Sequence, residues 1–113
     1  MLTTVVAEAA RMVALQNGPV SFPLPLTAVA IGKIAFIGIP GEPFNGIGRA
    51  LKENSDFDLV IPSCLVNGSE GYFPMKDAYD EGGYEARSSW FKAGVAELII
   101  AEGKKLLADL AKQ

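Results

Sequence analysis

The sequence predicts an α/β fold: a mixed β-sheet with a β-hairpin, a β-α-β segment and flanking helices. Two observations carry this prediction. An extended run at 20–30 and an apolar run at 34–39 are separated by the tight-turn pair Gly32-Lys33, which is typical of a hairpin. A helical pattern then lies between the second run and a third apolar run at 57–66, which is the order of a β-α-β unit.

The chain has 113 residues, which is enough for one domain with a single modest core. Half of the residues are hydrophobic and a fifth are charged, a composition typical of globular proteins rather than disordered ones. No internal repeat and no low-complexity linker divides the sequence. Residues 1–113 are therefore expected to form a single domain or a fragment of a larger one.

The first helix is expected to begin at Thr3 or Thr4, which can cap it, and to end at Asn17-Gly18. Pro23 and Pro25 forbid helix in the next segment and place its start at a sheet edge.

The strand at 34–39 is apolar at nearly every position, so we expect it to be central and covered on both faces. After the turn Pro40-Gly41-Glu42-Pro43, apolar residues at helical spacing predict a helix that ends near 54–55. The third strand at 57–66 has a possible break at Pro62.

A loop rich in Gly, Asn and Ser follows at 67–72. Pro74 can open a short helix through Tyr79, which Gly82-Gly83 ends. An irregular stretch precedes a long terminal helix that runs from Val95 to Leu110, with Gly103 as its weak point.

The charge balance disfavours several classes of function. The net charge is −3 and the basic residues are scattered, so nucleic-acid binding is not expected. The apolar runs are too short to span a bilayer, so no transmembrane segment is expected. Residues 1–18 lack the basic start and continuous apolar run of a signal peptide, and the compartment stays open.

The chain contains no histidine, which removes the commonest general base and the commonest zinc ligand. Cys64 is the single cysteine, so no internal disulfide can form. Because Cys64 lies in an apolar run, we expect a small buried side chain rather than a nucleophile.

Glu42 is the first candidate for chemistry. A buried strand that ends in Pro-Gly places this carboxylate at the carboxyl edge of the sheet, where open α/β folds bind ligands. The alternative is structural, because an acid at a helix N-terminus can simply cap the helix and complement its dipole. Position alone does not decide between the two.

The second candidate segment is the loop at 67–74, which follows another buried strand and is expected to open onto the same edge. Its Tyr72 can serve a site or fold back as a lid on the core. The third is the segment at 79–85, with Tyr84 and several carboxylates; a solvated helix face is its default interpretation, since the acids do not follow Ca²⁺-loop spacing.

Taken in order, three segments resemble the carboxyl-terminal part of the catalytic domain of neutral/alkaline ceramidases. They are IGKIAFIGIPGEPF at 31–44, NGSEGYFP at 67–74 and AYDEGGYEARSS at 78–89. The similarity covers roughly residues 24–112. It is the order and spacing of the three motifs that make the resemblance specific.

The resemblance implies a zinc-dependent hydrolase of N-acyl amides, in which zinc activates water. It implies that Glu42 and Tyr72 are zinc ligands and that Tyr84 hydrogen-bonds the oxygen of the scissile amide. In the family the remaining two zinc ligands are histidines of the amino-terminal part, and this chain has neither. The chain also carries Pro43-Phe44 where ceramidases have Phe-Thr, and Gly71 where they tend to have histidine.

Two hypotheses follow. In the first, the chain is the carboxyl-terminal part of a larger ceramidase-like zinc amidohydrolase, is inactive alone, and needs the missing amino-terminal part as its partner. In the second, it is a stand-alone, non-catalytic domain that acts through self-association as a homo-oligomer or through a protein partner. An apolar surface that needs covering would favour the second.

Overall fold

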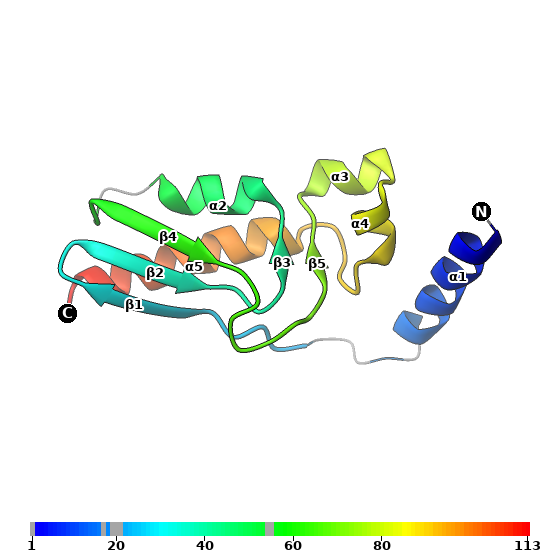
Figure 1. The fold of residues 1–113 in the computed structure, drawn as a ribbon, viewed down its shortest axis with the longest axis horizontal. Coiled ribbons are helices and arrows are strands. Elements are labelled where there is room, and N and C mark those ends of the chain that lie inside the picture. Colours follow the sequence, from blue (N-terminus) through cyan, green and yellow to red (C-terminus); the bar gives the residue numbers. More distant parts are fainter. Residues whose placement is uncertain (1, 17, 19–21, 54–55) are drawn as a thin grey trace.

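The computed structural model describes residues 2–16, 18, 22–53 and 56–113. Its elements confirm the predicted α/β layout of a mixed sheet, a hairpin and flanking helices (Figure 1). The helices are α1 Leu2–Gln16, α2 Asn45–Lys52, α3 Lys76–Glu81, α4 Tyr84–Ser88 and α5 Val95–Ala111. The strands are β1 Thr27–Ile31, β2 Ile34–Gly38, β3 Glu42–Pro43, β4 Leu59–Ser63 and β5 Tyr72–Phe73.

The three longer strands form one sheet in the order β1-β2-β4. β1 and β2 are antiparallel and meet at the predicted turn, where Gly32 adopts a positive φ of 60° that favours glycine. β2 and β4 are parallel, with Ile34 opposite Leu59, and α2 makes the crossover between them. The hairpin, the β-α-β segment and the central place of β2 are therefore confirmed.

Helices α2 and α5 pack against one face of this sheet and against each other. The core lies between them and the sheet, and its largest members are fully buried. They are Ile37, Ile39, Ile47, Leu51, Val60, Phe73 and Leu107. Along β1 and β2 the residues alternate between this face and the opposite one, as strand geometry requires.

The prediction that β2 is covered on both faces is wrong. Five apolar side chains point away from α2 and α5 and are 39 to 70% exposed: Val29, Ile31, Ile34, Phe36 and Leu59. We call these five residues the open face. An apolar strand is ambiguous in this respect, because hydrophobicity on both sides permits two covered faces without requiring them.

A second, two-stranded sheet was not expected from the sequence. β3 and β5 are short and parallel, and they continue the chain beyond β2 and β4. The predicted strand at 57–66 is correspondingly shorter, ending at Ser63, and Cys64 is exposed rather than buried because the chain turns there. The stretch between Gly83 and the terminal helix is irregular only in part, since Tyr84–Ser88 forms α4 while 89–94 contains no helix or strand.

The remaining helix predictions hold in outline. α2 ends at Lys52, and residues 54–55, where its end was predicted, lie outside the described residues. α3 ends at Gly82 in a left-handed conformation, with a φ of 71°, as predicted. α1 ends at Gln16, so Asn17 of its predicted end lies outside the described residues, and the helix contacts α4. No helix of the described residues is long and apolar enough to cross a membrane.

Gly103 is a packing contact rather than the weak point of α5. It is buried, and an added Cβ would lie 2.7 Å from Leu51 Cδ2 and 3.3 Å from Ile37 Cδ1. The glycine lets α5 approach both α2 and the central strand closely.

Two connections approach each other closely at the carboxyl edge of the sheet, where the loop after β4 crosses the turn after β2. A Cβ on Gly41 would lie 2.6 Å from the carbonyl oxygen of Gly71 and 2.6 Å from the ring of Phe73. Four backbone hydrogen bonds join the segments 39–42 and 65–71. The N–H groups of Leu65, Val66 and Glu70 donate to the carbonyl oxygens of Gly41, Ile39 and Pro40, and the N–H of Glu42 donates to that of Gly71. The two connections therefore form a single rigid unit.

We expect Gly41→Ala to lower the free energy of unfolding by about 2 to 4 kcal/mol, because neither the Gly71 carbonyl nor the buried ring can move aside. Urea denaturation measures the loss. Gly48→Ala is the matched control, since its Cβ would be 3.8 Å from the nearest atom and the helix gains up to about 1 kcal/mol from alanine. Equal stability of the two variants would contradict the role of the crossing.

Candidate functional site

The short parallel pair β3-β5 brings Glu42 and Tyr72 side by side. The two residues are register partners, and the backbone N–H of Glu42 donates to Gly71 O at 2.8 Å. The next register pair, Pro43 and Phe73, is followed by a second hydrogen bond, in which the N–H of Phe44 donates to Phe73 O at 3.2 Å. Paired residues of adjacent strands lie on the same side of a sheet, so the carboxylate and the phenol emerge next to each other.

Tyr84 completes the cluster from a different element. It is the first residue of α4, and its ring packs edge-on against that of Tyr72, with centroids 6.0 Å apart and an interplanar angle of 73°. Its side chain is 63% exposed. The three residues singled out in the sequence thus converge on one exposed surface, although they are separated by up to 42 positions along the chain.

The surroundings of Tyr72 are electronegative. Its pKa is raised above the ordinary value of a phenol, first by the negative charge of Glu42, then by partial desolvation, and further by Tyr84 and Glu85. A phenol in such a place keeps its proton at neutral pH. The same negative potential attracts a cation, and a bound cation would reverse the shift.

The structural alternatives for Glu42 and Tyr72 are not realised. The N-cap residue of α2 is Phe44, no side chain caps this helix, and its first turn contains no acid. Tyr72 stays half-exposed, while the next residue, Phe73, is the one that folds into the core and packs on Phe91 with ring centroids 5.3 Å apart.

Ser89 helps to hold the backbone of Tyr72 in place, and the sequence pattern did not single out this serine. This fully buried serine donates to Tyr72 O at 2.9 Å and accepts from the backbone N–H of Phe91 at 3.2 Å. The hydroxyl of Tyr79 lies 2.8 Å from Phe91 O and 3.2 Å from Ser89 Oγ, and burial raises its pKa. Arg11 of α1 donates from Nη1 to the carbonyl oxygen of Ser89.

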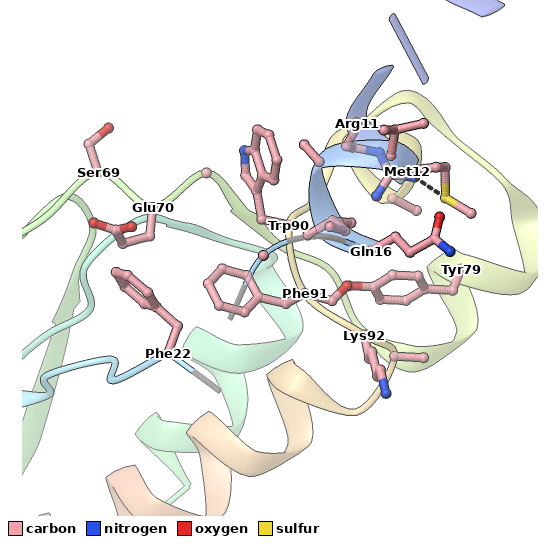
Figure 2. Close-up of a pocket in the computed structure, with 17 residues that line it drawn as sticks. Arg11, Met12, Gln16, Phe22, Ser69, Glu70, Tyr79, Trp90, Phe91 and Lys92 are labelled. Carbon is pink, nitrogen blue, oxygen red and sulfur yellow. Dashed lines mark hydrogen bonds between the residues drawn. The ribbon is translucent and has the colours of Figure 1, made fainter. Parts of the chain in front are cut away.

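An open pocket of about 1200 Å³ lies beside this cluster, between α1 and the segments around Gly71 and Trp90. Figure 2 shows the ring of Phe91 facing that of Phe22, with Trp90 above them and Arg11 and Met12 of α1 on another side. The Nε of Arg11 is buried and has no hydrogen-bond partner among the described residues. The pocket adjoins the cluster at Gly71, where a Cβ would lie 3.5 Å from the indole of Trp90.

The donor set of the cluster fits part of a zinc site. Glu42 offers a carboxylate and Tyr72 a phenol, both of which are oxygen ligands once deprotonated. Within the described ranges no three His, Cys, Asp or Glu side chains are grouped as a metal centre. A catalytic zinc normally has at least three protein ligands, so these two residues alone would not complete such a site.

No protein-family model matches the sequence, and no curated protein or solved structure matches the chain. The resemblance to ceramidases consequently rests on the three sequence motifs alone.

We expect Ser89→Ala to reduce the free energy of unfolding by about 2 kcal/mol, because Tyr72 O and Phe91 N–H lose a buried partner. Chemical denaturation measures this cost. Ser69→Ala, at an exposed loop position, is the matched control and should change stability by less than about 0.5 kcal/mol. A neutral Ser89→Ala would show that the network contributes nothing to stability.

Glu42→Gln should bring the pKa of Tyr72 down toward that of a free phenol, because it removes the main cause of the shift. Carbon-13 NMR of the three tyrosines against pH measures each phenol separately. Glu81→Gln, on the exposed side of α3, is the control and should leave Tyr72 unchanged.

The sign of the linked stability follows from the same shift. A raised pKa means that the folded state holds the Tyr72 proton more tightly than the unfolded chain, whose tyrosines titrate near pH ~10. The resulting stability is fully present below that value and is lost as pH rises through the folded pKa. Glu42→Gln should therefore weaken this alkaline dependence, and an unchanged profile would contradict the proximity of the two groups.

Proposed function

We propose that the chain contributes two ligands, Glu42 and Tyr72, to the zinc ion of a ceramidase-like N-acyl amide hydrolase, and that the remaining ligands come from another polypeptide region. The observation that carries the proposal is the pairing of Glu42 with Tyr72 in β3-β5, with the ring of Tyr84 packed against Tyr72. The spacing of the three motifs provides independent support.

Each residue has a distinct role in this proposal. Glu42 supplies a negative charge and an oxygen ligand, and Tyr72 supplies a second oxygen, whose deprotonation the cation must favour. Tyr84 is exposed and keeps its hydroxyl available to donate to the amide oxygen as negative charge develops there. Zinc, when bound, polarises the amide carbonyl and makes water a nucleophile near neutral pH.

The rigidity of the surroundings suits such a role. Glu42 and Tyr72 are both held through backbone hydrogen bonds, to Gly71 and from Ser89 respectively, so their Cα positions do not depend on the metal. Catalytic groups gain from this kind of preorganisation, because little reordering is needed when the ligand arrives. The chain alone is nevertheless expected to be inactive, since it offers two ligands and no histidine.

A second candidate function is a non-catalytic domain that acts by association. The open face favours it, because five large apolar side chains on one side of a sheet resemble an interface more than a solvent surface. In that case the Glu42–Tyr72 pair would be a surface cluster without a metal.

Zinc titration of the full chain, followed by tyrosine NMR, distinguishes the two functions. We expect Zn²⁺ at millimolar concentration to shift the Tyr72 signals and lower its pKa, since a cation favours the phenolate. Tyr79, which is half-buried and hydrogen-bonded to Ser89, should not respond and is the internal control. Glu42→Gln should abolish the response, and Mg²⁺ should not reproduce it.

No response of Tyr72 to zinc would refute the proposed ligand pair. Tight stoichiometric zinc binding or amide hydrolysis by the chain alone would refute the incompleteness of the site. Recovery of amidase activity on mixing with a histidine-bearing upstream polypeptide would support the proposal in full.

A further inference from the structure

The open face is ordered in two rows across the sheet. Ile31, Ile34 and Leu59 are successive register partners in β1, β2 and β4, and they form the first row. Val29 and Phe36 are paired in the same way and continue toward Ile61, which is half-buried, as the second row. All six side chains are apolar, so the surface is continuous rather than a scatter of single exposed residues.

None of the described elements covers these rows. α2 and α5 occupy the opposite side of the sheet, and α1 contacts α4 at the far end of the molecule (Figure 1). The three strands also contain no charged residue, since their sequences are TAVAI, IAFIG and LVIPS. The net charge of −3 is therefore carried elsewhere, and two such faces can meet without like-charge repulsion at their centre.

The exposed area is close to what a small dimer interface needs. From their exposed fractions, the five side chains of the open face expose on the order of 400 Å², which lies within the size range of the apolar surface patches that are often functional. Two copies face to face would bury about 800 Å² from these side chains alone, and Thr27, Ile61 and Ser63 at the margin extend this toward the ~1,000 Å² of a specific interface.

We propose that the open face is a homodimer interface, in which the sheets of two copies pack face to face about a two-fold axis. A two-fold interface uses the same patch on both copies and must be self-complementary, which a charge-free apolar face is. β2 is the central strand, so the axis passes near Ile34 and Phe36, and Phe36 is the aromatic residue at the centre of the patch. The two sheets would stack about 10 Å apart, as in a β-sandwich.

This inference is independent of the proposed zinc site. The open face contains none of Glu42, Tyr72 and Tyr84, and it is formed by different strands. A dimer can thus exist whether or not the chain binds zinc, and failure of either proposal leaves the other standing.

Sedimentation velocity of the full chain over a range of concentrations tests the dimer. We expect a monomer–dimer equilibrium with a dissociation constant on the order of micromolar, because the interface lies at the lower end of the size range. Phe36→Asp should raise that constant at least about tenfold, since it places a desolvated charge at the centre of the patch.

Leu98→Asp is the matched control. Leu98 is 61% exposed on α5, on the helical side of the sheet, so the same change there should leave the dimer intact. Circular dichroism shows whether each variant is folded. If Phe36→Asp unfolds the chain, Ile31→Lys on the edge strand, which is 70% exposed, takes its place.

Three outcomes overturn the proposal. The first is a wild-type chain that remains monomeric at high micromolar concentration, which would leave the face to a different polypeptide. The second is a dimer that folded Phe36→Asp or Ile31→Lys does not weaken. The third is a dimer that Leu98→Asp disrupts as strongly as Phe36→Asp, which would place the interface elsewhere.

Discussion

The structure depends on one crossing, where the loop that follows β4 lies directly on the turn that follows β2. Backbone hydrogen bonds of 2.8 to 3.0 Å join the two connections, and Gly41 provides the space for them. Parallel strands cannot be joined by a tight turn, so their carboxyl ends are free to lead into separate connections that meet at the same edge. Here the two connections pair with each other and form β3 and β5, which carry Glu42 and Tyr72. The geometry of the candidate site is thus a consequence of backbone packing, and it requires no ligand.

The two faces of the main sheet differ in how much of their apolar surface is covered. Helices cover one face of the sheet, while the fully apolar β2 presents Ile34 and Phe36 on the other. Hydrophobic burial on one side supplies the core, but the opposite side still contacts water across several large side chains. The chain therefore has two incompletely satisfied regions, an acidic phenol–carboxylate cluster at the sheet edge and an apolar face on the strands. These are the two regions on which the proposed zinc ligands and the proposed dimer interface lie.

Much of the fold could be predicted because local signals were strong. Gly32-Lys33 between two extended runs indicated the hairpin, and Gly82 indicated the end of α3. The convergence of Glu42 and Tyr72 at one edge also followed from their positions after parallel strands. By contrast, coverage of β2 could not be predicted, because an apolar residue looks the same in sequence whether or not another layer packs on it.

Other features escaped prediction for specific physical reasons. α4 has only one buried residue, Ala86, and so lacks an apolar period. Cys64 directly follows β4, which ends at Ser63, three residues before the predicted end at 66, and its side chain is exposed. Ser89 depends on hydrogen bonds to Tyr72 and Phe91, and such tertiary partners leave no local pattern.

The unequal sequence separations of the two strand pairings imply an order of folding. The β1-β2 hairpin closes across two residues, and events of this kind take microseconds, whereas the β2-β4 pairing must close the loop that contains α2. The hairpin is therefore expected to form first and to present Val29, Ile31 and Phe36 before β4 and the helices arrive. During that interval its apolar strands are free to pair with those of other nascent chains, so the yield of refolding should fall as protein concentration rises.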